Sequence, residues 1–130
     1  MVDHQLDGQA TVVTGGASGI GAATCRLLAA PARRGRRPVE AWDPGLTRSA
    51  AIDHADDGAR VSEVGPGFID TPLLRKRHVA AGIAVLQSLH PLGRLGLATA
   101  VAEAIAWLTS PAASFVTCAI LAVDGCHTVR

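Results

Sequence analysis

The sequence has few aromatic residues, no long apolar run and no leader-like start, and each absence excludes a class of protein. Aromatic residues make up 3% of the 130 residues and hydrophobic residues 48%. The core is therefore built from Ala, Val, Leu and Ile, which suits helices packed tightly on a parallel sheet. No apolar run reaches the roughly 18 residues of a membrane helix. The first residues lack the basic-then-apolar order of a signal peptide, so we expect a cytoplasmic protein.

An excess of one charge and an even set of cysteines are also lacking. The formal net charge is +1, which gives no general attraction to nucleic acid or to a membrane. Cys25, Cys118 and Cys126 form neither a metal-ligand spacing nor a disulfide set, so we expect reduced thiols. The histidines show no ligand pattern either, and we interpret all of them as surface or loop residues. They are His4, His54, His78, His90 and His127. We predict no metal site.

The most informative stretch is Thr14-Gly15-Gly16-Ala17-Ser18-Gly19-Ile20-Gly21. A β-branched run over 10–14 predicts a buried parallel strand before it, and apolar residues at helical spacing predict a helix after it. Backbone N–H groups at a helix start lack partners within the helix, and the macrodipole adds positive charge, so a pyrophosphate fits there. Glycine lets the chain turn without a Cβ that would hold the phosphate away. The alternative is a glycine turn that only packs the helix closely on the strand.

A second strand is predicted over Val39-Glu40-Ala41-Trp42-Asp43. Asp43 stands 22 positions after Gly21, near the offset of about 20 at which a carboxylate accepts a hydrogen bond from the adenosine ribose. Its charge would repel a 2′-phosphate, which favours NAD over NADP. An equally supported alternative makes Asp43 the start of an Asp-Pro-Gly turn.

We interpret residues 31–59 as an irregular connector. The four arginines between Pro31 and Pro38 have no aromatic neighbour, so we favour a solvated basic segment over a phosphate or nucleic-acid patch. Three aspartates and one histidine over 44–60 match no metal-ligand template, and we predict a solvated loop there.

The second half of the chain alternates strand and helix patterns. Residues 60–64 predict a strand that leads into a turn, and 119–123 predict a continuous apolar strand. A helix is predicted from Pro72, with Thr71 as its N-cap and with Pro91 after its end. A second helix is predicted over 98–109, closed by Ser110-Pro111. The apolar positions of both helices recur at i, i+3, i+4 and i+7. They are Val79, Gly82, Ile83 and Leu86 in the first helix and Val101, Ala104, Ile105 and Leu108 in the second.

Several of these motifs resemble the short-chain dehydrogenase/reductase family over about residues 8–30 and 60–126. The resembling segments are 14–21, 64–72, 91–96, 110–111 and 123–125. The resemblance implies a Rossmann-like α/β fold, a doubly wound parallel sheet that binds NAD or NADP.

The resemblance also implies which residues hold the dinucleotide. The residues of the glycine turn that it assigns to the cofactor are Gly15, Ser18, Gly19, Ile20 and Gly21. It implies that Pro66, Gly67 and the backbone near Ile69 face the nicotinamide ring and its carboxamide. The Thr71 hydroxyl is expected to contact polar groups of the cofactor.

The chain departs from the family in length. The family fold has seven strands and needs roughly 200 residues or more, because each strand-helix-strand unit takes roughly 30. We predict one truncated domain over 1–130, made of a cofactor-turn half (8–45) and a C-terminal half (60–126), with strands 1, 2, 6 and 7 of the family. We further predict that 10–14 pairs directly with 61–64 in the order 2-1-6-7. That pairing would bring the two glycine turns together at the carboxyl ends of the strands.

The chain also departs in the residues that would catalyse. The resemblance implies a catalytic Asn, Ser and Tyr-x-x-x-Lys, but the sequence has no tyrosine, and its one lysine, Lys76, lies in Arg75-Lys76-Arg77 beyond the Pro-Gly motif. Loss of such a proton relay costs typically 10²–10⁴-fold in rate. We therefore assign no catalytic residue and predict no turnover.

Two alternatives to a dinucleotide-binding domain stay open. One is a non-enzymatic subunit that joins itself or intact relatives through 98–109 and 119–123, which the resemblance implies form a subunit contact. The other is an unstable product of a damaged gene. Cys118 and Cys126 stand where the family usually has glycine. If either position needs a positive φ, cysteine there costs of the order of 1–3 kcal/mol.

Overall fold

The computed structural model describes residues 19–28 and 44–129. The predicted strands 10–14 and 39–43 lie outside these residues, as do Gly15, Ser18 and Asp43. The direct pairing of 10–14 with 61–64 therefore stays a prediction.

Two strands form the central parallel ladder. β1 (Glu63–Pro66) pairs with β4 (Ile120–Val123), in a register that sets Glu63 opposite Ile120 and Pro66 opposite Val123. The strand predicted over 119–123 is confirmed, whereas β1 begins later than the predicted residue 60. Before β1 the pairing is irregular, because the Val61 N–H donates to the Thr117 hydroxyl at 3.1 Å while its carbonyl accepts from the N–H of Cys118, which has a positive φ.

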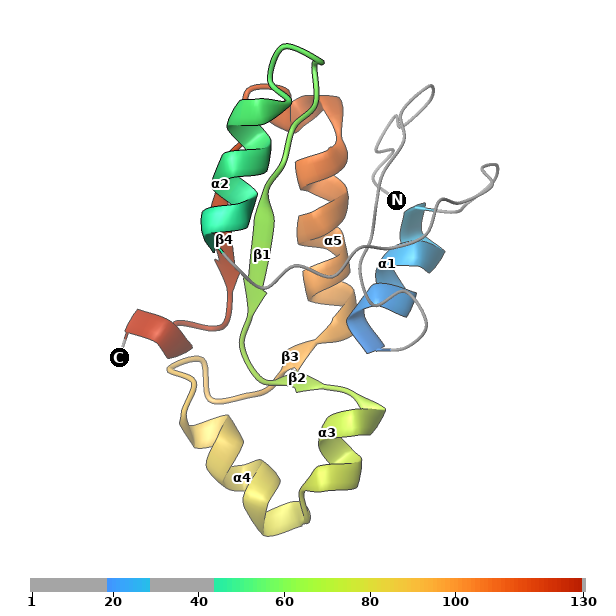
Figure 1. Ribbon diagram of the computed structural model, residues 1–130. Coiled ribbons are helices and arrows are strands. Elements are labelled where there is room, and N and C mark those ends of the chain that lie inside the picture. Colours follow the sequence, from blue (N-terminus) through green and yellow to red (C-terminus); the bar gives the residue numbers. More distant parts are fainter. Residues whose placement is uncertain (1–18, 29–43, 130) are drawn as a thin grey trace.

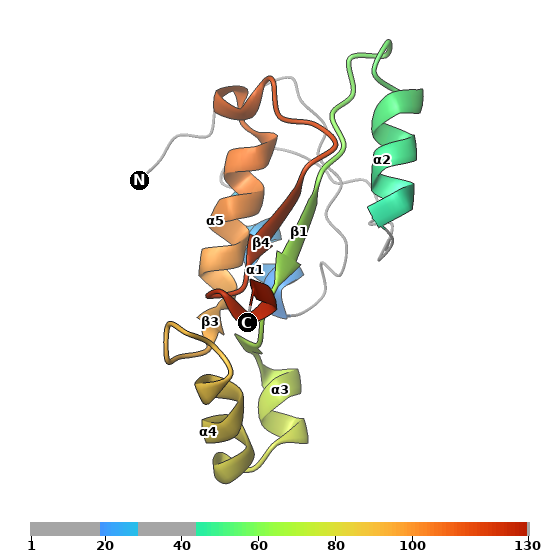
Figure 2. The same ribbon diagram turned by 90° about the vertical axis from the view of Figure 1, so that its left-hand side faces the viewer.

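Helices cover the β1–β4 ladder from opposite sides. In both views α2 (Pro44–Asp53) lies on one side and α5 (Ala98–Thr109) on the other (Figures 1 and 2). The prediction of α5 and of its Ser110 end is confirmed. The prediction of a solvated loop over 44–60 is wrong across α2, which buries Thr47 and Ala51 on one face. The Thr47 hydroxyl also donates to Glu63 Oε2 at 3.3 Å. Because threonine is polar, this buried face gives no apolar helical pattern in the sequence.

Small residues let α1 (Gly19–Leu28) pack closely on α5. Ala23 of α1 and Ala102 and Ala106 of α5 are all buried. Thr24 is fully buried as well, and its hydroxyl donates to the Ile20 carbonyl at 3.1 Å, so the burial leaves no unpaired polar atom there. Alanines of the predicted aliphatic core therefore join these two helices.

An arm made of α3 (Pro72–Arg77) and α4 (Ala80–Ser88) extends beyond the ladder (Figures 1 and 2). A short parallel pair, β2 (Ile69–Asp70) with β3 (Gly96–Leu97), stands at its base. Thr71 caps α3 as predicted. The single predicted helix is wrong, because His78 and Val79 are extended and separate α3 from α4. The apolar positions Gly82, Ile83 and Leu86 of α4 are only half-buried, and Val79 before the helix is 78% exposed, since α4 projects past the helices that cover the ladder.

Arg60 joins the end of α5 to the segment that precedes β1. Its guanidinium donates to the carbonyls of Leu108 at 2.7 Å, Val116 at 3.0 Å and Ser110 at 3.4 Å. The last carbonyls of a helix lack partners within the helix, so this arginine satisfies groups that would otherwise be unpaired.

A short 3₁₀ turn, η1 (Pro111–Ala113), follows α5, and a second, η2 (His127–Val129), follows β4.

Cysteine occupies two left-handed backbone positions. Cys118 has a φ of 61° and Cys126 a φ of 69°, so both positions have the positive φ at which a cysteine is strained. A Cβ is strained in this region, at a cost of roughly 1–2 kcal/mol per residue, whereas glycine is not.

We expect Cys118→Gly and Cys126→Gly each to raise the free energy of unfolding by about 1 kcal/mol, measured by urea denaturation. Cys118→Ala and Cys126→Ala are the matched controls, because alanine removes the thiol and keeps the strained Cβ. If the alanine variants gain as much as the glycine variants, backbone strain is not the cause.

Candidate functional site

The start of α1 lies against the segment that follows β1. Gly19 has a φ of +54°, and a Cβ built on it would stand 3.5 Å from the Thr71 methyl carbon. The structure therefore brings Gly19, from the described part of the predicted cofactor turn, next to Thr71 of the Pro-Gly segment (64–72). Gly21 beside it is buried and Ile20 is half-buried.

Thr71 has a structural task that fixes its side chain. Its Oγ1 accepts a hydrogen bond from the Leu74 N–H at 3.3 Å, as the N-cap of α3. The hydroxyl oxygen is the acceptor in this bond, so the hydroxyl proton remains available for donation to another group. Thr71 can thus hold the helix and still donate its hydroxyl proton to another group, while its methyl carbon faces Gly19.

Asp70 and Arg75 form an ion pair beside Thr71. Arg75 Nε donates to one carboxylate oxygen of Asp70 and a second guanidinium nitrogen donates to the other, both at 2.6 Å. These hydrogen bonds hold the pKa of Asp70 below its ordinary value and raise that of Arg75. Both groups are partly exposed, so we assign the pair an orienting role rather than a large contribution to stability.

Gly67 lies where no other residue fits. A Cβ at this position would stand 2.7 Å from His90 Nε2 and 2.9 Å from the Asp124 Cα. Pro66 before it is the last residue of β1, and Ile69 after it is buried in the β2–β3 pair. The predicted residues Pro66, Gly67 and Ile69 therefore belong to one closely packed turn.

His90 is the residue of this region that sequence reasoning missed. All histidines are expected in surface or loop positions, and His90 does lie in a bend after α4, but it is only 3% exposed. Its Nε2 lies 3.1 Å from the Phe68 N–H and its Nδ1 lies 2.9 Å from the Leu86 carbonyl. The Phe68 ring also contacts His90 and His127 edge-on, at centroid distances of 5.7 and 5.1 Å. A lone histidine before a proline gives no periodic signal that would reveal these contacts.

Asp124 fastens the end of the chain beneath the same turn. Its carboxylate accepts from the Thr128 hydroxyl at 2.6 Å, the Thr128 N–H at 2.8 Å and the Cys126 N–H at 3.0 Å. These donors, the Thr128 hydroxyl first, lower the pKa of Asp124. Because the Asp124 backbone also faces Gly67, the carboxylate fixes one wall of the turn.

The lowered pKa of Asp124 predicts a loss of stability in acid. A carboxyl whose pKa is lowered by folding stabilises the protein above its unfolded-state pKa and loses that contribution as the pH falls through the folded-state value. We expect the wild type to lose stability below about pH 4, and Asp124→Asn to lose less over the same range, although Asp70 still contributes. Urea unfolding at pH 7 and pH 3 measures both. Asp56→Asn, at an exposed position, is the control and should follow the wild type, and an equal acid loss in Asp124→Asn would contradict the assignment.

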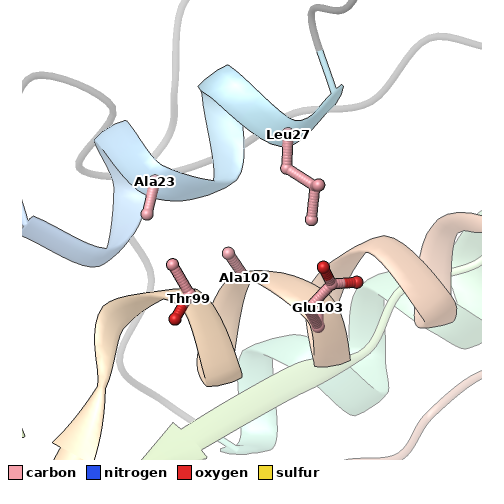
Figure 3. A pocket seen from close by; sticks show the side chains of 5 residues that line it. All are labelled: Ala23, Leu27, Thr99, Ala102 and Glu103. Atoms are coloured by element: carbon pink, nitrogen blue, oxygen red, sulfur yellow. The ribbon is translucent and has the colours of Figure 1, made fainter. Parts of the chain in front are cut away.

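Other candidate sites do not involve these residues. A shallow groove of about 310 Å³ lies between α1 and α5 and is lined by Ala23, Leu27, Thr99, Ala102 and Glu103 (Figure 3). Among the residues that the structure describes, no three His, Cys, Asp or Glu side chains gather where they would hold a metal ion. Within the same residues no helix has the length and apolar character to cross a membrane.

A family model matches the C-terminal two thirds of the chain. The family model described as enoyl-(acyl carrier protein) reductase matches residues 44–128. This segment contains Pro66, Gly67, Ile69 and Thr71 and begins after the glycine turn.

Several curated relatives are named as dehydrogenases, two of them of cyclohexane derivatives. The chain is 51% identical over 88 residues to cis-4-hydroxycyclohexanecarboxylate dehydrogenase of Sinomonas cyclohexanicum, covering 64% of this chain and 33% of that protein. It is 45% identical over 86 residues to cyclohexanol dehydrogenase of Acinetobacter sp. strain SE19, covering 66% of this chain and 33% of that protein. The match spans about a third of the length of these relatives.

Solved structures share the fold over two thirds of the chain. A short chain dehydrogenase family protein from Francisella tularensis subsp. tularensis SCHU S4 has a TM-score of 0.64 and 27% identity, covering 67% of this chain and 40% of that one. ElxO, solved with NADP bound, has a TM-score of 0.60 and 33% identity, covering 67% of this chain and 36% of that one. These matches confirm the predicted Rossmann-like α/β fold in incomplete form.

Proposed function

This chain belongs to the short-chain dehydrogenase/reductase family, and on that premise we propose that it holds part of a nicotinamide dinucleotide site without the groups for turnover. The contact between Gly19 and Thr71 carries this proposal. It sets the N-terminus of a ten-residue helix, whose first N–H groups lack partners within the helix, beside Thr71. ElxO, which matches this part of the chain, was solved with NADP.

The residues present fit a dinucleotide in chemistry. At Gly19 the absence of a Cβ would let a phosphate approach the backbone N–H groups of the helix start. We assign the phosphate end to Gly15, Ser18, Gly19, Ile20 and Gly21. We assign the nicotinamide end to Pro66, Gly67, Ile69 and Thr71. A bound nicotinamide would supply the acceptor or donor of a hydride.

We propose NAD as the preferred form because of Asp43. A carboxylate at the ribose would accept its hydroxyl and repel a 2′-phosphate. Asp43 lies outside the described residues, so this preference rests on its position in the sequence.

The absence of turnover is proposed from the side chains available. The chain has no tyrosine, and Lys76 stands on α3, exposed, after Thr71. The family mechanism needs a phenol whose pKa is lowered by a nearby ammonium. This chain lacks the phenol, and its one lysine ammonium is exposed on the projecting arm. The chain would then bind the dinucleotide and not exchange a proton with a substrate oxygen.

We expect Gly19→Val to weaken NAD⁺ binding at least tenfold, because a β-branched residue is strained at this φ and fills the space beside Thr71. Titration calorimetry with NAD⁺ and with NADP⁺ measures the change. Gly58→Val is the matched control, since Gly58 has a φ of +72° with nothing within 4 Å of a built Cβ. It carries the same backbone strain away from the site.

The control separates binding from general destabilisation. We expect both variants to lose stability and only Gly19→Val to lose affinity. Equal loss of affinity in both, or no binding of NAD⁺ and NADP⁺ by the wild type, contradicts a dinucleotide site.

A second candidate function is a subunit role, which exposed apolar residues on α5 and β4 favour. Trp107 and Ile120 are each 43% exposed, and such residues are enriched where proteins associate. We expect a dimer in solution by light scattering, and Trp107→Glu to shift it to monomer. Arg48→Glu, a charge reversal at an exposed position of α2, should leave the mass unchanged. A monomeric wild type alone and with an intact relative would contradict the subunit role.

A further inference from the structure

We propose that His90 is a positioning residue that fixes the turn Pro66–Phe68 and ties it to the end of α4. The inference rests on the proposed function, in that the turn is assigned to the nicotinamide end. His90 itself is buried behind the turn and is not among the residues assigned to touch the dinucleotide.

The two ring nitrogens of His90 have different partners. Nε2 faces the Phe68 N–H, which can only donate, so Nε2 must accept. Nδ1 faces the Leu86 carbonyl, which can only accept, so Nδ1 must carry the proton. One neutral tautomer meets both requirements, and it links the last turn of α4 to the backbone of the turn.

Close packing leaves the turn few other positions. The space that a Cβ of Gly67 would need is taken by His90 Nε2 and by the Asp124 backbone. The Phe68 ring lies edge-on to both imidazoles, and the two imidazoles stand 5.2 Å apart. His127 in turn contacts the Leu89 carbonyl through Nδ1 at 3.2 Å. The turn is thus held by residues from the end of α4 and from the end of the chain.

The arm gives this contact its importance. α3 and α4 have no buried residue of their own, and both views show them beyond the ladder (Figures 1 and 2). A buried hydrogen bond at the base of the arm therefore decides how the turn sits relative to it. A shift of the turn would move Thr71 relative to Gly19, and so would reach the proposed site.

Two amide substitutions separate the two hydrogen bonds of His90. In His90→Gln the longer side chain places an oxygen near the Nε2 position, where it can accept from Phe68. In His90→Asn the shorter amide reaches the Nδ1 position only, where it can donate to Leu86. Each variant keeps one bond, so their melting temperatures should be similar.

We expect His90→Asn to weaken NAD⁺ binding about tenfold and His90→Gln to leave it within about threefold. ADP-ribose, which lacks the nicotinamide, should bind both variants equally. His78→Asn is the control, because His78 is exposed on the same arm. A merely structural role would predict equal affinity at equal stability.

A measurement without ligand tests the hydrogen bond itself. In the ¹⁵N-labelled protein an N–H···N bond gives a scalar coupling between the Phe68 amide nitrogen and His90 Nε2. We expect this coupling in the wild type, and we expect the amide shifts of 67–71 to move in His90→Asn and to stay near wild type in His90→Gln.

The outcomes are distinct. No coupling in the wild type, or unmoved amide shifts in His90→Asn, overturns the role of His90. Equal NAD⁺ affinity in the two variants, with the coupling present, also overturns it. If the wild type binds neither NAD⁺ nor NADP⁺, the proposed function fails, and the coupling and amide shifts still decide whether His90 positions the turn.

Discussion

The parallel pairing of β1 with β4 is the constraint on which the site depends. Because Pro66 stands opposite Val123, the next residues of the two strands, Gly67 and Asp124, emerge side by side. The two backbones then come so close that a Cβ at Gly67 would overlap the Asp124 Cα. Glycine is required there by the approach of the chains, whatever the turn binds.

The rest of the molecule keeps that pairing in place. α5 covers one side of the ladder. Arg60, in the segment that leads into β1, binds carbonyls at and after the end of α5. α1 reaches α5 only because alanines line their contact. This packing carries Gly19 to Thr71, so an alanine-rich core of few aromatic residues has a direct consequence for the proposed dinucleotide site.

Features specified by neighbouring residues could be predicted, and features specified by distant ones could not. The Thr71 cap with Pro72 after it and the extent of α5 follow from local chemistry, whereas the strain at Cys118 and Cys126 was inferred from the family resemblance and from a condition that the structure meets. α2 was missed because one of its buried positions is a threonine, bonded to Glu63. The break at His78 and Val79 was missed because an apolar helical period does not say whether a partner helix exists to bury it.

The sequence alone determined the family, the glycine turn, the Pro-Gly segment and the lack of a tyrosine, because these are matters of residue identity and spacing. The tertiary structure decided that Gly19 lies against Thr71, that Gly67 has no room for a side chain and that His90 is buried between Phe68 and Leu86. Except for the local contact of His90 with Leu86, these contacts join residues that are at least 22 positions apart. Local propensity is silent about such pairs, because only the packing of the ladder and its helices sets their distance.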